Sequence, residues 1–167
     1  LGVAEEVKLS LAAEPLIRPL CLLIKWFLRQ HNLNVPFTGG FSSYTVYLLV
    51  RFYLQARKRI TSGPYPTNKG DSLGAHFMGL LYFYGHGVFD REHALIQIEG
   101  EGRVAWKDES ILHDPHQRDR LCLQDPLDAK NNVSRMSFAD YQIFTLLGST
   151  YDLLAQKVFP DYETWYA

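Results

Sequence analysis

The chain has 167 residues, of which 47% are hydrophobic and 21% charged, and its formal net charge is −1. This length can bury a substantial core and fits one domain of ordinary globular composition. The nearly neutral charge argues against a nucleic-acid module held by a broad basic face, although it allows a local basic patch. No apolar run reaches the roughly 18 residues that a membrane span needs, because Lys25 interrupts the longest one.

Two further features concern where the protein works. Cys21 and Cys122 lie far apart in apolar settings, which predicts two free, buried thiols and a reducing compartment. No signal peptide is visible, since Glu5 and Glu6 lie in the opening segment. Leu1 is not a natural start, so we expect the chain to be part of a longer polypeptide.

The first half of the chain predicts three helices, at residues 3–13, 16–30 and 43–58, where apolar residues recur at helical spacing. Residues 16–30 are apolar on nearly every side, so we expect them to form the central buried helix. Lys25 and Arg29 are the exceptions, and they lie one turn apart on one face of that helix.

The second half predicts two more helices, at residues 72–84 and 137–158. Between them, residues 94–106 alternate around a glycine-bearing turn, which is typical of a β-hairpin. Residues 107–120 and 121–135 are rich in polar and turn-forming residues and are expected to be loops. The expected fold is therefore mainly α, with one short β-hairpin near residues 94–106.

Helix ends and connections can also be assigned from residue type. Residues 32–41 and 61–71 are expected to be loops, and the aromatic tail at residues 159–167 could pack back on the core or be loose. Ser137 is a plausible N-cap of the last helix, with Asp140 as its third residue. The candidate caps of the earlier helices are Thr38, Ser42 and Ser43 for the third and Asp71 and Ser72 for the fourth.

The stretch from Cys122 to Arg135 concentrates carboxylates, side-chain amides and cations. Pro126 bars a regular helix at its start, and its short polar side chains favour turns. On composition alone, a surface loop that binds nothing is the more common interpretation. The alternative is an ordered loop whose amides and carboxylates read the edge of a base.

Two other features could complete such a site. Lys25 and Arg29 place two positive charges on one helix face, which suits a polyphosphate, although two snorkelling side chains would look the same. Ser43 and Tyr44 lie where a glycine loop becomes a helix, where an anion can bind and an aromatic ring can stack on a base. The alternative there is a helix cap beside one core aromatic residue.

Other candidate sites are weaker. His113 and His116 with Asp114 have no further His or Cys at ligand spacing, so a metal site is disfavoured. Ser149 follows Gly148 but lies inside a helical pattern, with no turn from strand to helix, and is interpreted as a packing residue. The Arg57–Arg59 cations could touch RNA backbone, although a solvated helix end is the more common role. The sequence has no phosphate-binding loop motif and no apolar strand bearing an Asp-x-Asp pair, so it lacks the carboxylates that hold metal for nucleotidyl transfer.

Several short segments together resemble one known family. In chain order they are Leu16-Ile-Arg-Pro-Leu20, Leu22-Leu-Ile-Lys-Trp-Phe-Leu28, Asn32-Leu-Asn34, Thr38-Gly-Gly40, Ser43-Tyr44, Ser72-Leu-Gly74, residues 81–85 and residues 121–135. Over residues 1–157 the chain resembles the template-independent RNA nucleotidyltransferases of the DNA polymerase β-like superfamily. These are the poly(A) polymerases, including the enzyme of the TRAMP complex, and the terminal uridylyltransferases.

The resemblance is to the central, PAP-associated domain of these enzymes, which would make residues 1–167 a single domain with its nucleotide recognition motif at residues 121–135. The family's catalytic domain, with a Gly-Ser motif and three metal-binding aspartates, precedes this region and is absent from the sequence given. Gly148-Ser149 is not that motif, because no strand with Asp-x-Asp follows it. The resemblance therefore implies no catalytic residue here, Mg²⁺ or Mn²⁺ only in the full-length enzyme, and an inactive chain on its own.

The resemblance also implies roles for individual residues. The positions that match contacts to the nucleotide triphosphate are Lys25, Arg29 and Ser43, and those that match contacts to the base are Tyr44, Asp125, Asp128 and Asn131. Many uridylyltransferases carry His where this chain has Asn131. A shorter Asn leaves room for a purine and offers both a donor and an acceptor, which favours ATP over UTP.

The leading hypothesis is therefore the nucleotide-recognising domain of a poly(A) polymerase that adds AMP from ATP to RNA 3′ ends. The alternatives are a terminal uridylyltransferase domain and a non-catalytic docking or scaffold module. The implied partners are an RNA 3′ end and a nucleotide, and also a zinc-knuckle RNA-binding protein and a helicase, with no membrane. The expected location is intracellular, in the nucleus or cytoplasm, with the nucleus favoured.

Overall fold

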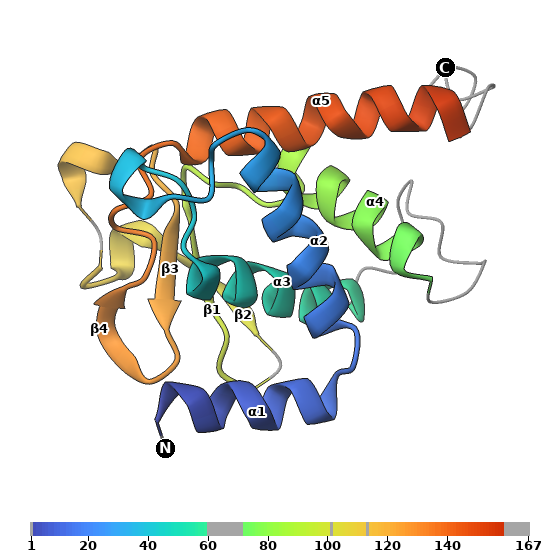
Figure 1. The fold of residues 1–167 in the computed structure, drawn as a ribbon. Helices are drawn as coiled ribbons and strands as arrows, with labels where there is room; N and C mark the ends of the chain where they lie inside the picture. The colour runs from blue at the N-terminus through green and yellow to red at the C-terminus, as the bar shows by residue number, and fades with distance from the viewer. Residues whose placement is uncertain (1, 60–71, 101, 113, 159–167) are drawn as a thin grey trace.

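The computed structural model describes residues 2–59, 72–100, 102–112 and 114–158, which form five α-helices, three short 3-10 helices and four strands. The fold is mainly α with a small β element, as predicted. The α-helices are α1 (Val3–Ala13), α2 (Ile17–Gln30), α3 (Ser43–Arg57), α4 (Leu73–Gly85) and α5 (Asp140–Val158). The strands are β1 (Ala94–Gln97), β2 (Arg103–Trp106), β3 (Cys122–Asp125) and β4 (Asp128–Asn132). In Figure 1, α5 lies along the top, α1 along the bottom, and the strands to the left of α3.

The central helix is α3 rather than α2. Leu22 and Trp26 of α2 are 58% and 60% exposed, so only one side of this helix faces the core. The prediction that residues 16–30 form the central buried helix is therefore wrong. Apolar composition does not say how many neighbours cover a helix, and α3 lies between α1 and α5 behind α2 (Figure 1). The buried residues of α3 are Thr45, Val46, Tyr47, Leu48, Leu49, Val50, Phe52, Tyr53 and Leu54.

Helices α4 and α5 cross at two glycines. A Cβ atom placed on Gly85 would lie 2.2 Å from the backbone nitrogen of Gly148, and one on Gly148 would lie 2.8 Å from the carbonyl oxygen of Gly85. The backbones approach so closely that a side chain has no room at this crossing. Ser149, the residue interpreted as packing, is exposed, so that prediction is wrong, and the packing role belongs to the neighbouring Gly148. Gly85 is also the last residue of its helix, and the close crossing gives a steric reason for a glycine there.

The last helix begins three residues later than predicted. Helix α5 starts at Asp140, so the assignment of Ser137 as its N-cap is wrong. The N–H of Ser137 donates to the carbonyl of Ser134 at 2.8 Å, and the N–H of Ala139 donates to the carbonyl of Gly39 at 3.0 Å. The first contact is a local turn, whereas the second ties the segment to a distant loop, an effect that local sequence does not reveal.

The predicted hairpin is confirmed, with β1 and β2 antiparallel and Gln97 paired to Arg103. It belongs to a larger mixed sheet of order β2-β1-β3-β4, in which β1 and β3 are parallel. The prediction that residues 121–135 form a loop is wrong, because β3 and β4 form a second, antiparallel hairpin. Residues of β4 have low strand propensity, so the neighbouring buried strand β3 decides the outcome.

The segment at residues 107–120 is mostly irregular, as expected, with short 3-10 helices at Lys107–Glu109 and Pro115–Gln117. Its first residue was not foreseen as buried. Lys107 is only 3% exposed, and its ammonium group donates to the backbone carbonyls of Arg91, Glu92, Arg118 and Arg120. Lys107 therefore joins the chain before β1 to the chain before β3.

Both cysteines are free thiols, with Cys122 buried and Cys21 partly buried. Burial raises the pKa of Cys21 to about 12 and that of Cys122 to about 11, so neither is a thiolate at neutral pH. Among the described helices, none has the length and apolarity to span a bilayer. Predictions for the loop at residues 61–71, the tail at residues 159–167 and His113 lie outside the described residues.

Candidate nucleotide-recognition site

The carboxylate of Asp125 gathers three hydrogen-bond donors at the end of β3. Its Oδ1 accepts from the hydroxyl of Tyr44 at 3.1 Å and from the N–H of Leu127 at 3.0 Å. Its Oδ2 accepts from the Nδ2 of Asn131 at 3.0 Å. Three residues that the sequence singled out are thus joined, although Tyr44 lies on α3 and is 81 residues from Asp125.

Short polar side chains shape the hairpin that carries Asp125. Asp125 pairs with Asp128 across the turn, but Gln124 pairs with Asn132, so β4 is bulged over residues 129–131. Asp128 Oδ1 accepts from the N–H of Lys130 at 3.0 Å, in the manner of an Asx turn. A bulge of this kind changes the direction of side chains relative to a regular pair of strands. Asn131 lies within this bulge.

Tyr44 is anchored on both its ring and its hydroxyl. Its ring stacks on Tyr47, with centroids 6.0 Å apart and planes at 16°. Burial, together with the charge and hydrogen bond of Asp125, raises the pKa of Tyr44 well above its ordinary value. The hydroxyl therefore stays protonated and acts as a donor. Tyr44 is partly buried, so stacking on a base stays a prediction.

The start of α3 separates the roles of two neighbouring serines. Ser42 is the N-cap, and its Oγ accepts from the N–H of Thr45 at 3.0 Å. Ser43 is the exposed first residue of the helix, and within the described part of the chain its hydroxyl makes no hydrogen bond. Ser43 is therefore available to a ligand at a helix N-terminus, where backbone N–H groups are free.

Lys25 and Arg29 lie on the solvent side of α2, and both are exposed. Neither side chain has a hydrogen bond or ion pair to another described residue. The structure thus leaves both charges uncompensated, but it does not join them to the Asp125 group. Asp128 is likewise exposed, and within the described ranges its side chain bonds only to the N–H of Lys130 in its own turn.

The remaining candidates are used within the protein. Lys58 forms an ion pair with Glu14 at 3.1 Å, and Arg57 contacts His76, so these cations are partly committed to structure. Asp114 accepts the N–H of His116 at 3.0 Å. Across the described ranges, no three His, Cys, Asp or Glu side chains gather as they would around a metal ion.

The contact between Tyr44 and Asp125 can be tested by removing one atom. We expect Tyr44→Phe to lower the free energy of unfolding by about 1 kcal/mol, because Asp125 loses one of its donors. Urea unfolding followed by circular dichroism would measure the change. The matched control is Tyr141→Phe, since Tyr141 is 67% exposed and should change stability by less than about 0.5 kcal/mol. Equal midpoints for the two variants would contradict a role for this hydrogen bond.

The chain is similar to known proteins in both sequence and fold. A family model for Cid1 family poly A polymerase matches residues 72–131. Poly(A) RNA polymerase cid14 of Schizosaccharomyces pombe is 32% identical over 145 residues, which are 87% of this chain and 21% of that protein. Poly(A) RNA polymerase protein 1 of Saccharomyces cerevisiae is 31% identical over 160 residues, covering 94% of this chain and 24% of that protein.

A solved structure, the polymerase core of TRAMP, an RNA surveillance complex, matches with a TM-score of 0.81 and 28% identity. The match covers 95% of this chain and 49% of that one. The chain thus spans about half of this solved relative and between a fifth and a quarter of the two curated relatives. Sequence and fold agree that the chain is a PAP-associated domain of a nucleotidyltransferase.

Proposed function

We propose that this chain is the nucleotide-recognising part of an RNA adenylyltransferase that adds AMP from ATP to RNA 3′ ends. The observation that carries the proposal is the hydrogen bond from Asn131 Nδ2 to Asp125 Oδ2, at 3.0 Å. This bond turns the nitrogen end of the Asn131 amide toward Asp125, so the oxygen end points away from Asp125. Because one N–H of the amide nitrogen is committed to Asp125, the oxygen is the acceptor that this orientation presents to a base.

The outward oxygen of Asn131 favours adenine by its hydrogen-bonding character. An amide oxygen only accepts, and adenine presents an exocyclic amino donor. Uracil presents a carbonyl oxygen at the corresponding position, so the two acceptors would repel one another. Asn131 Oδ1 makes no hydrogen bond to any other described residue and is exposed on β4.

In this proposal Asp125 is a positioning residue. Three donors already occupy most of its acceptor capacity, so its main role is to hold Asn131 and Tyr44 in place. Asp128 is free to contact the base through water. The triphosphate would be held by Lys25, Arg29 and Ser43, whose side chains have no hydrogen-bond or ion-pair partner in the described ranges.

The divalent metal of such enzymes does not fit the residues described here, since no group of three metal-ligating side chains exists among them. The metal and the catalytic carboxylates would belong to parts of the enzyme that this chain does not span. We expect the 167-residue chain alone to leave an RNA primer unextended with ATP and Mg²⁺. Its contribution to the rate would be positioning of the nucleotide.

Nucleotide choice is tested by Asn131→His in the full-length enzyme. Histidine fills the space beside the base and removes the outward amide oxygen, so the ratio of kcat/KM for ATP to that for UTP should fall. Discrimination by one side chain is about 1–3 kcal/mol, which corresponds to a fall of roughly ten-fold to a hundred-fold. The control is Gln142→His, which adds the same side chain at an exposed position of α5. If Asn131→His left the ratio of kcat/KM for ATP to that for UTP unchanged, the proposal would be contradicted.

The substrates on this proposal are an RNA 3′ end and a nucleoside triphosphate. Its solved relative is the core of an RNA surveillance complex, which supports action within an assembly. A zinc-knuckle RNA-binding protein and a helicase as partners, and a nuclear location, stay predictions from the resemblance.

A further inference from the structure

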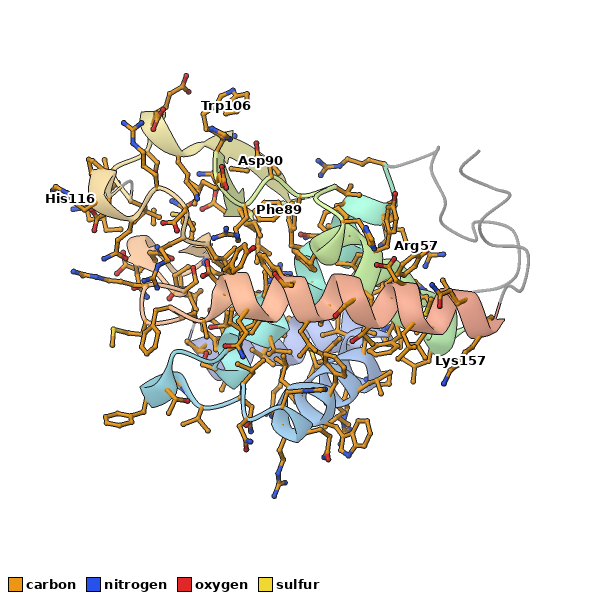
Figure 2. The ribbon with its side chains drawn as sticks, turned by 90° about the horizontal axis from the view of Figure 1, so that it is seen from above. Arg57, Phe89, Asp90, Trp106, His116 and Lys157 are labelled. Carbon is orange, nitrogen blue, oxygen red and sulfur yellow. The ribbon has the colours of Figure 1, made fainter. Side chains whose placement is uncertain are left out.

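A cleft of about 350 Å³ opens between the segment at residues 107–122 and the stretch from Lys130 to Arg135. This volume lies within the range of ~300–1,000 Å³ that is typical of ligand sites. In Figure 2 the segment carrying His116 lies at one end of the molecule and Lys157 at the other, so the cleft is remote from the end of α5. Asn131, which donates to Asp125, also lines this cleft, so the cleft adjoins the Asp125 hydrogen bonds.

The walls of the cleft are strongly cationic. Four cationic side chains and one carboxylate line it, in a chain whose net charge is −1. Arg120, Lys130 and Arg135 make no side-chain hydrogen bond or ion pair with any described residue. The carboxylate, Asp114, already accepts the N–H of His116. Such an excess of one charge in a concave surface attracts ions of the opposite sign.

Lys107 carries the fourth positive charge of the cleft lining, on a side chain that is itself buried. Its ammonium group is saturated by backbone carbonyls and cannot donate to a ligand. Its charge nevertheless adds to the potential within the cleft, because a buried charge is screened less than an exposed one.

Asn132 supplies an oriented neutral donor. Its Oδ1 accepts the N–H of Leu123 at 3.1 Å and the N–H of Ser134 at 3.0 Å, which fixes the orientation of the amide. The Nδ2 group is left with two protons, and within the described residues nothing accepts them. Since Asn132 lines the cleft, this donor is available to an oxygen-rich ligand there.

We propose that this cleft binds the phosphodiester backbone of single-stranded RNA. Three cations without a described partner, Arg120, Lys130 and Arg135, line it together. A nucleic-acid strand binds to such a group by placing several phosphates against the cations and releasing their counterions. Strand β4 joins the cleft to the Asp125 group, because Asn131 bonds to Asp125 and also lines the cleft between Lys130 and Asn132. An RNA held here lies beside the site where its next nucleotide is recognised. The choice of RNA rests on the proposed function, whereas the cleft's preference for anions does not.

The test compares two triple variants of the 167-residue chain. Arg120→Ala, Lys130→Ala and Arg135→Ala together remove the free cations of the cleft. The control removes equal charge at exposed positions outside it, with Lys8→Ala, Arg18→Ala and Lys157→Ala. Binding of fluorescein-labelled 15-nucleotide oligo(A) is measured by fluorescence anisotropy over a series of salt concentrations, after circular dichroism has shown that both variants are folded.

The cleft variant should raise the Kd for oligo(A) at least about ten-fold, and the slope of log Kd against log salt should fall by about two, as for three lost contacts to a single strand. The control variant should bind as the wild type does. Equal Kd values for the two variants would overturn the proposal. Stronger competition by an oligoglutamate peptide than by unlabelled oligo(A) would also overturn it, in favour of an acidic protein partner. Because this assay involves no nucleotide selection, its result is separable from that of Asn131→His.

Discussion

Gly85→Ala is expected to lower the free energy of unfolding by at least about 3 kcal/mol. The new methyl carbon would lie 2.2 Å from the backbone nitrogen of Gly148 and 2.4 Å from its Cα, so neither helix can accept it without moving. A flexible side chain could rotate away, but backbone atoms of a packed helix cannot. Helices α4 and α5 must separate at their crossing, which opens the contacts on either side, including the pair of Tyr82 and Tyr151, whose ring centroids are 5.0 Å apart.

The matched control is Gly74→Ala on the same helix. A Cβ on Gly74 would meet nothing within 4 Å, so alanine should stabilise the protein by about 0.5–1 kcal/mol through its helix propensity. Urea unfolding at equilibrium measures both variants. If Gly85→Ala were as stable as Gly74→Ala, the glycine would serve helix termination alone and the close crossing would be wrong.

The helices were predictable because each one carries a local signal. Apolar spacing located all five, and Ser72 was correctly chosen as a cap, since its Oγ accepts from the N–H of Ala75 at 3.2 Å. The position of each helix in the fold was not predictable from its own residues. Helix α2 is as apolar as a central helix, yet Trp26 is 60% exposed, because burial depends on which elements lie beside it.

In the candidate site, too, the local features were predictable from the sequence and the contacts between distant residues were not. The turn-forming character of Asp125 and Asp128 was visible in the sequence, and both side chains do accept nearby backbone N–H groups. The meeting of Asp125 with Tyr44 was not visible, because the contact spans 81 residues and depends on packing β3 against the start of α3. The resemblance to a family grouped these residues, and the hydrogen bonds supply a physical reason for the grouping. Lys107 gave no signal, since a single lysine in a polar segment is ordinarily exposed.

The Asp125 hairpin is held from two sides by buried polar contacts. On one side, Asp140 is 1% exposed and accepts the N–H of Leu121, directly before β3. On the other, Lys107 bonds the carbonyl of Arg120, the residue before that. These two contacts fix the backbone where β3 begins. We expect the orientation of Asn131, in the second strand of the hairpin, to depend on these two contacts.

Lys107→Met should consequently have a large effect on stability, a loss of about 3 kcal/mol. Methionine has nearly the length of lysine but no donor, so the carbonyls of Arg91, Glu92, Arg118 and Arg120 lose their shared partner. A buried acceptor left without a partner costs about 1–3 kcal/mol. Water entering from the adjacent cleft can satisfy some of the four, which keeps the expected loss below their sum.

The measurement is equilibrium urea unfolding, with Lys130→Met as the control. Lys130 lines the same cleft but is exposed and bonds no described residue through its side chain, so its replacement should change stability by less than about 0.5 kcal/mol. A loss below about 1 kcal/mol in Lys107→Met would show that water replaces the ammonium group at little cost. In that case Lys107 would matter for the charge of the cleft rather than for joining the strands, and its replacement would weaken RNA binding while leaving the hairpin folded.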